Sequence, residues 1–422
     1  MSDNDDNSGS KCPFANLSRR NFFKAVGGLG LFAAGAGAGI VGAPAVKHAL
    51  GLDGSQNLAD AVPFYGMHQA GITTPQQSHS YFASFDLMTD NREAIVNMLK
   101  SWTDASAKMT GGNLDDSSLG LPHSRLTMTF GFGPGLFSKD GKDRYGLASR
   151  KPAALVDLPK FNGDQLMPER SGGDISVQAC ADDPQVTFHA IRQIVKLAGD
   201  VAKVRWSQIG FTSGNGRETP RNLQGFKDGT QNPQSREMAQ FVWAGAEGPG
   251  WMQDGSYLVF RRIRIALEHW DKTDVDFQEQ VIGRNKLTGA PLSGKKEFDA
   301  IDLNATDKDG NYLIPENSHV RLASAAMNNG AQILRRGYSY NDGANYTAER
   351  WPPWRQGIEY DAGLLFVCYQ KDPRTGFIKI FNNMAKMDML NQFTTHTASA
   401  VFACPGGVMD GEFIGQRLFT SA

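Results

Sequence analysis

The chain has 422 residues, of which 40% are hydrophobic, 21% charged and 10% aromatic. This length has room for two or three domains, each with its own core, and the composition excludes a disordered chain, a collagen and a disulfide-rich miniprotein. The 43 basic and 44 acidic side chains give a formal net charge of −1, so no basic excess indicates a nucleic-acid partner.

The first 45 residues have the pattern of an export leader. Arg19 and Arg20 precede a weakly apolar stretch rich in Gly and Ala, and Ala43-Pro44-Ala45 supplies a small-x-small cleavage pattern. Paired arginines before such a stretch resemble a twin-arginine signal, which exports folded proteins and predicts a periplasmic location. The alternative is a transmembrane anchor, which the many glycines disfavour. No later stretch is apolar for long enough to predict stable membrane insertion.

Beyond the leader, strand-like and helix-like patterns alternate. Residues 46–80 are rich in Gly, Gln, Pro and His and predict an extended arm. A period of two then predicts strands and a period of 3.6 predicts helices. In chain order, we expect a strand at 80–87, a helix at 92–109, a half-buried strand at 126–130, a helix at 185–202, a strand at 257–265, a helix at 274–282, strands at 332–340 and 363–369, and a helix at 375–389.

The strand and helix order recurs in two halves of similar size. The predicted fold class is therefore α+β, a duplicated unit with antiparallel sheets and flanking helices. The predicted domains are residues 46–215, including the arm, and residues 216–422.

Common catalytic motifs are absent from the sequence. The eight histidines form no HExxH pattern, there is no P-loop and no GxSxG elbow, and the one GxGxxG match, residues 37–42, lies in the leader. The four cysteines form no CxxC pair, which argues against a zinc ribbon or a thioredoxin-type site. The apolar run around Cys368 predicts a buried thiol, and a Cys180–Cys404 disulfide remains open.

Three segments stand out in the second half: 225–233 (GFKDGTQNP), 317–321 (NSHVR) and 334–340 (LRRGYSY). Taken singly, they have ordinary structural interpretations, namely a surface turn, a structural histidine and a solvated pair of arginines.

Taken together and in this order, the three segments resemble the dye-decolorising peroxidase family, which binds haem b. The resemblance extends over residues 62–415 and is closest to an exported subgroup associated with ferrous-iron uptake and described as deferrochelatase/peroxidase. Further matching segments are FYGMHQAGI at 64–72, SGGD at 171–174, CADD at 180–183 and IGR at 282–284.

The resemblance implies two ferredoxin-like domains, with one haem b in the C-terminal half and His319 as its iron ligand. Neutral imidazole leaves the opposite face of the iron open, and a carboxylate on the other ring nitrogen would fix its tautomer. Asp388 is our candidate for that carboxylate. On the open face, Asp228 would transfer the proton of the peroxide and Arg335 would stabilise the developing charge. Adjacent strand residues point to opposite faces, so Arg336 would point away from the iron and be free for surface or structural pairing.

Other haem contacts are also implied by the resemblance. The expected contacts to the haem edge or its propionates are Gly229, Thr230, Gln231, Arg284 and Ser324.

The implied activity is reduction of H2O2 through a ferryl intermediate, with oxidation of small aromatic or dye substrates. The close alternative is a deferrochelatase that removes iron from intact haem, a porphyrin substrate, and a third hypothesis is a haem or iron carrier without turnover. The joint presence of Asp228 and Arg335 favours an enzyme over a carrier. The expected partners beyond substrates are components of an iron-uptake system and a second copy of the chain in a homodimer.

Overall fold

The computed structural model describes residues 61–112, 121–213, 219–348 and 356–420. The predicted leader and the first part of the predicted arm lie outside these residues. Residues 61–78 are irregular apart from one 3-10 turn, η2 (Ala70–Ile72). Within the described ranges, every helix is too short or too polar to cross a membrane.

The first half of the chain follows the order strand, helix, strand, strand, helix, strand. Its strands pair antiparallel in the spatial order β2-β3-β1-β4, which defines a ferredoxin-like unit. Its main elements are β1 (His79–Leu87), α3 (Arg92–Thr110), β2 (Thr127–Phe132), α4 (Pro134–Phe137), β3 (Ile175–Ala181), α5 (Pro184–Ala198) and β4 (Ala202–Phe211).

The second half repeats this order with longer insertions, and its strands pair antiparallel as β7-β8-β5-β9. The predicted α+β fold with duplicated antiparallel units is thus confirmed. The elements are β5 (Ser256–Ile265), α8 (Val275–Ile282), β7 (Tyr338–Ala348), β8 (Gln356–Gln370), α10 (Phe377–Met387) and β9 (Thr394–Cys404), with the shorter α6 (Met238–Phe241), α7 (Leu267–Trp270), α9 (His319–Ala323), β6 (Leu334–Arg335) and α11 (Gln416–Thr420).

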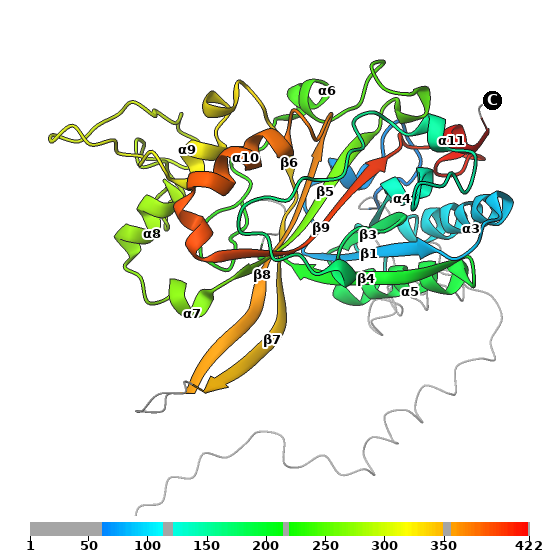
Figure 1. Ribbon diagram of the computed structural model, residues 1–422, viewed down its shortest axis with the longest axis horizontal. Helices are drawn as coiled ribbons and strands as arrows, with labels where there is room; N and C mark the ends of the chain where they lie inside the picture. The colour runs from blue at the N-terminus through cyan, green and yellow to red at the C-terminus, as the bar shows by residue number, and fades with distance from the viewer. Residues whose placement is uncertain (1–60, 113–120, 214–218, 349–355, 421–422) are drawn as a thin grey trace, which may run out of the picture. The chain divides into compact units, whose positions relative to one another are not determined.

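The two four-stranded sheets are joined at two places. Phe132 of β2 pairs with Ala403 of β9, and Phe211 of β4 pairs with Ser339 of β7. Between the sheets, the ring of Phe82 packs 4.9 Å from that of Phe260. Figure 1 shows β5 and β9 side by side, and it shows β7 and β8 continuing as a two-stranded hairpin away from the other strands.

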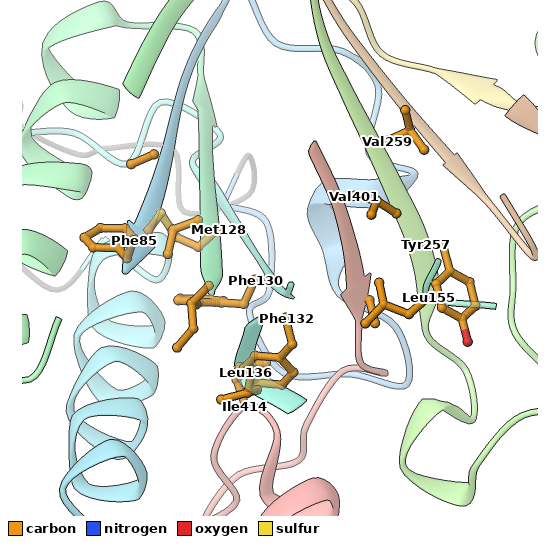
Figure 2. Packing of buried hydrophobic residues seen from close by; sticks show 14 of the residues in the cluster. Phe85, Met128, Phe130, Phe132, Leu136, Leu155, Tyr257, Val259, Val401 and Ile414 are labelled. Atoms are coloured by element: carbon orange, nitrogen blue, oxygen red, sulfur yellow. The ribbon is translucent and has the colours of Figure 1, made fainter. Parts of the chain in front are cut away.

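The main apolar core lies between the first sheet and its helices and continues to β5, β9 and α10 of the second half. Figure 2 shows Phe85 of β1 beside Met128 and Phe130 of β2, and all three are buried. The predicted half-buried strand is therefore wrong in one respect, because all six residues of β2 are buried. One cause is the close packing of η2 on this strand: a Cβ at Gly71 would lie 2.2 Å from the Thr129 hydroxyl.

Several predicted boundaries also differ from the structure. The predicted helix at 185–202 ends at Ala198, because Gly199 adopts a positive φ of 53° and β4 begins at Ala202. The helix predicted at 375–389 spans only Phe377–Met387. Strands β3, β4 and β9 were not predicted. Three cysteines, Cys180, Cys368 and Cys404, are buried free thiols, so the open Cys180–Cys404 pairing does not form.

The strand predicted at 332–340 is divided into β6 and β7 without a change of register. Arg335 lies opposite Cys368 and Tyr338 lies opposite Leu365. At the interruption, the carbonyl of Gly337 accepts a hydrogen bond from the Gln76 side chain at 2.6 Å. The continuous register preserves the alternation of side chains that the sequence predicts for this segment.

Candidate active site

A cavity of about 240 Å³ lies in the second half of the chain, between α9, α10, β6, β8 and the loop that carries Asp228. Helices α9 and α10 both line this cavity and contact each other, and Figure 1 shows the two helices next to each other. Most of its lining is aliphatic or aromatic, which suits a large flat hydrophobic ligand. The apolar lining includes Ile263, Ile265, Ile282, Val320, Ile333, Leu364, Phe366, Phe377, Ile380, Phe381, Met384 and Leu390.

His319 is the first residue of α9 and lines this cavity. Its Nδ1 lies 2.7 Å from Oδ2 of Asp388, the residue that follows α10. The other oxygen of Asp388 accepts from the backbone N–H of Leu390 at 2.8 Å, which fixes the orientation of the carboxylate. An imidazole that donates from Nδ1 to a carboxylate keeps the lone pair on Nε2, ready to bind a metal. The predicted pairing of His319 with Asp388 is confirmed.

Asp228 and Arg335 meet on another part of the cavity wall. Arg335 Nη1 donates to Asp228 Oδ1 at 2.9 Å, and both side chains are about a quarter exposed. Asn232 holds the backbone of Arg335 from both sides: its Nδ2 donates to the Arg335 carbonyl at 2.7 Å and its Oδ1 accepts from the Arg335 N–H at 3.0 Å. The acid and the cation are therefore fixed relative to each other.

Arg336 points away from this cavity, as strand alternation predicts. Its side chain is buried and donates to the Thr74 carbonyl and to Gln77 Oε1. The ordinary interpretation of the arginine pair as solvated is therefore wrong for Arg336, and its role is to tie β6 to the segment before β1.

Arg284 is the second guanidinium of the cavity. Its Nη1 donates to the carbonyls of Gly289 and Glu297 at 2.6 and 2.9 Å. Its Nη2 is buried and has no hydrogen-bond partner among the described residues. Burial, and next the nearby Arg335, lower the pKa of Arg284. A buried donor beside a second cation needs an anionic partner.

Of the other residues predicted to contact haem, some line the cavity and one does not. Thr230 and Gln231 line the cavity, and Thr230 donates to Glu297 at 3.1 Å. Gly229 lies outside the lining and has a φ of 114°, a conformation that favours glycine at this turn. Ser324 lines the cavity, but its hydroxyl donates to the Arg321 carbonyl at 2.7 Å and so closes a turn.

Glu297 was not singled out in the sequence, although it organises the loop of Asp228. It forms an ion pair with Lys227, and it accepts from Thr230. Burial alone would raise the pKa of Glu297, but hydrogen bonds led by that from Lys227 lower it. Glu297 therefore holds Lys227 and Thr230, which lie one position before and two positions after Asp228 in the turn.

A buried polar cluster behind the cavity was also missed. Arg261 and Asp164 form an ion pair with no exposed side-chain surface, and the guanidinium lies over the ring of Phe381. Arg261 Nε donates at 3.0 Å to Nδ1 of His396, which lines the cavity. A neutral His396 must then carry its proton on Nε2. Burial, and next the charge of Arg261, keep the pKa of His396 well below its usual range.

Comparisons with known proteins agree with this geometry. Residues 69–212 match the family model "Dyp-type peroxidase, N-terminal", and residues 219–409 match "Dyp-type peroxidase, C-terminal". The chain belongs to the dye-decolorising peroxidase family. It is an enzyme, a haem-dependent peroxidase, as the sequence resemblance predicted.

Similar proteins include a dye-decolorizing peroxidase of Thermobifida fusca, 38% identical over 95% of this chain and 97% of the relative. A deferrochelatase of Escherichia coli K12 is 34% identical over 95% of this chain and 96% of the relative. Among solved structures, a DyP-type peroxidase from Streptomyces coelicolor has a TM-score of 0.78 and 40% identity, covering 86% of this chain and 97% of that one.

The residues of the cavity fit a haem. The apolar walls suit a porphyrin, and the open Nε2 of His319 suits iron. The partnerless Nη2 of Arg284 suits a propionate. These residues therefore offer one group for each chemical part of the cofactor.

The neutral state of His396 predicts a pH dependence of stability. Below a pH of about 6.5, the unfolded chain protonates this histidine whereas the folded chain resists it. The free energy of unfolding should therefore fall on acidification from pH 6.5 to 5, by at most about 1.4 kcal/mol per pH unit from this group. In urea titrations, His396→Gln should show a shallower fall than the wild type.

His269→Gln is the matched control, because His269 is exposed. This variant should keep the wild-type pH dependence. An unchanged slope in His396→Gln would show that protonation of His396 does not oppose folding.

Proposed function

We propose that this protein is an exported haem b peroxidase that reduces H2O2 and oxidises small aromatic or dye molecules. The observation that carries the proposal is the cavity in which His319 with its carboxylate and the Asp228–Arg335 pair meet. Haem, when bound, supplies the iron that exchanges electrons with the peroxide.

His319 would hold the iron through Nε2. Asp388 strengthens this ligand, because a carboxylate that accepts from Nδ1 raises the basicity of the imidazole. Arg284 would hold a propionate, and Thr230, Gln231 and Ser324 would line the haem edge.

Asp228 and Arg335 would act on the peroxide. The Asp228 carboxylate accepts a proton from one peroxide oxygen and delivers it to the other, which makes the departing oxygen a neutral water. The Arg335 guanidinium stays charged and stabilises the negative charge on the separating oxygens. Their hydrogen bond keeps both groups on one side of the cavity.

The first test concerns the iron ligand. His319→Ala should lose stoichiometric haem, because it removes the proposed ligand. It should remain folded, because the Asp388 carboxylate still accepts from the Leu390 N–H. Absorption spectra and pyridine haemochrome titration measure haem type and content. A variant that keeps a five-coordinate histidine spectrum and one haem b per chain would transfer the role to another histidine.

The second test concerns the peroxide side. Loss of one preorganised electrostatic donor costs on the order of 100- to 1000-fold in rate, and loss of a proton shuttle costs roughly 100- to 10,000-fold. Since a water molecule can replace the shuttle in part, Arg335→Leu should slow the haem absorption change after H2O2 mixing more than Asp228→Asn. Stopped-flow spectroscopy measures both rates.

The control is Arg236→Leu, because Arg236 is exposed and lies outside the cavity lining. It should react like the wild type. Arg336 is unsuitable for this purpose, since its buried hydrogen bonds make Arg336→Leu destabilising. Slow reaction in Asp228→Asn beside fast reaction in Arg335→Leu would reverse the proposed division of roles.

Iron release from intact haem is the second candidate, because relatives named deferrochelatase are 34% identical over 95% of this chain. The His319–Asp388 pair favours retention of iron, since it strengthens the iron ligand. We therefore expect no metal-free porphyrin when the haem-loaded protein is incubated with a reductant. Porphyrin fluorescence measures this, and a steady rise that requires native protein would favour the deferrochelatase.

The remaining parts of the proposal follow from the leader and the family. We propose twin-arginine export to the periplasm, one haem b per chain and a homodimer. An association with iron-uptake components is proposed from the sequence resemblance.

A further inference from the structure

A second cavity, of about 560 Å³, lies on the other side of a short chain segment from the haem cavity. Ala331 and Gln332 line both cavities. Its other walls come from α6, the start of β5, the end of β8 and the start of α10. No residue proposed above to act on haem or peroxide lines it.

Among the described charged side chains that line this cavity, one basic residue is left without an acidic partner. Glu247 pairs with Lys371 at 2.8 Å, and Asp372 pairs with Arg374 at 2.6 Å. Lys379 of α10 also lines the cavity, and it has no acidic partner among the described residues. The lining therefore carries an uncompensated positive charge.

The start of α10 adds to this charge. Thr375 and Gly376, just before the helix, lie in the cavity lining. The first turn of this 11-residue helix has no acidic residue, and its first N–H, that of Phe377, donates to the Gln370 side chain at 2.6 Å. The amino end of a helix carries a partial positive charge, which favours an anion beside it.

Tyr257 provides an independent sign of a ligand. The residue is only 2% exposed and lines the cavity, yet its hydroxyl has no hydrogen-bond partner in the described ranges. Burial, and next the nearby Asp372, raise the pKa of Tyr257, so the hydroxyl stays protonated and available as a donor. Figure 2 shows the ring beside Leu155, and the packing of both buried residues holds the hydroxyl in place.

The rest of the cavity wall is partly apolar. Phe241, Ala244 and Pro249 lie on one side, and Ala153 and Ala154 also line it. A flat aromatic ring can pack against these apolar side chains, whereas a small inorganic anion would leave them exposed to water.

We propose that this cavity binds a small aromatic carboxylate, with its carboxylate on Lys379 and the Tyr257 hydroxyl and its ring against Phe241 and Pro249. Binding requires no turnover, so the proposal goes beyond the proposed peroxidase function and does not depend on it. The site would hold its ligand one chain segment away from the haem cavity.

The test is a fluorine NMR titration of the haem-loaded protein with 4-fluorobenzoate, in the presence of excess cyanide to occupy the open face of the haem. Saturable binding is expected. Lys379→Met should weaken it about tenfold or more, because a charge-assisted hydrogen bond is lost, and Tyr257→Phe about two- to tenfold. The neutral 4-fluorobenzamide should bind the wild type at least about tenfold more weakly than the acid.

Two control variants separate this cavity from other sites. Lys386→Met changes an exposed lysine of the same helix that lines neither cavity, and Arg335→Leu changes the haem cavity. Both should keep the wild-type affinity. Absence of saturable binding, equal weakening by Lys386→Met, or loss of binding in Arg335→Leu would each overturn the proposal, and circular dichroism verifies that the variants are folded.

Discussion

Strand β8 is hydrogen-bonded to β5 along one edge and to β7 and then β6 along the other. Each pairing fixes the register of a segment that carries site residues. The pairing with β6 sets Arg335 opposite Cys368, and alternation along β8 turns Leu364 and Phe366 into the haem cavity. Because a slip by one residue would exchange Arg335 for Arg336 on the cavity side, the chemistry of the site depends on this register.

The cavity combines apolar walls with charges of fixed position. Asp388 is hydrogen-bonded to the side of His319 that faces away from the open Nε2. The guanidiniums of Arg284 and Arg335 line the cavity, and the Asp228 carboxylate pairs with that of Arg335. Low polarity strengthens each of these interactions, and it also makes an unpaired donor costly. The same reasoning accounts for His396, which stays neutral next to a buried cation. The protein therefore allows a charge here only where a partner or a ligand offsets it.

Local patterns in the sequence predicted much of this arrangement. The period of two along residues 334–340 placed Arg335 and Arg336 on opposite faces, and helical periodicity found α3, α5 and α8. Strand β3 escaped detection because the alternation of apolar and polar side chains over residues 175–178 is short and is followed by the small residues Ala179, Cys180 and Ala181, and all seven residues are buried. Contacts between segments that are far apart in the sequence could not be predicted either. Arg261 and His396 are separated by 135 positions, and nothing local marks either residue as a partner of the other.

The same separations bear on how the protein folds. His319 and Asp388 are 69 positions apart, and Asp228 and Arg335 are 107 positions apart. Contacts of such long range form slowly, because the loops between them must first be closed. The haem cavity is complete only when β8 and α10 are in place, because Arg335 pairs with β8 and Asp388 follows α10. A cofactor that binds only this finished state shifts the folding equilibrium towards it by mass action, so haem supply would set the fraction of chains that stay native under stress.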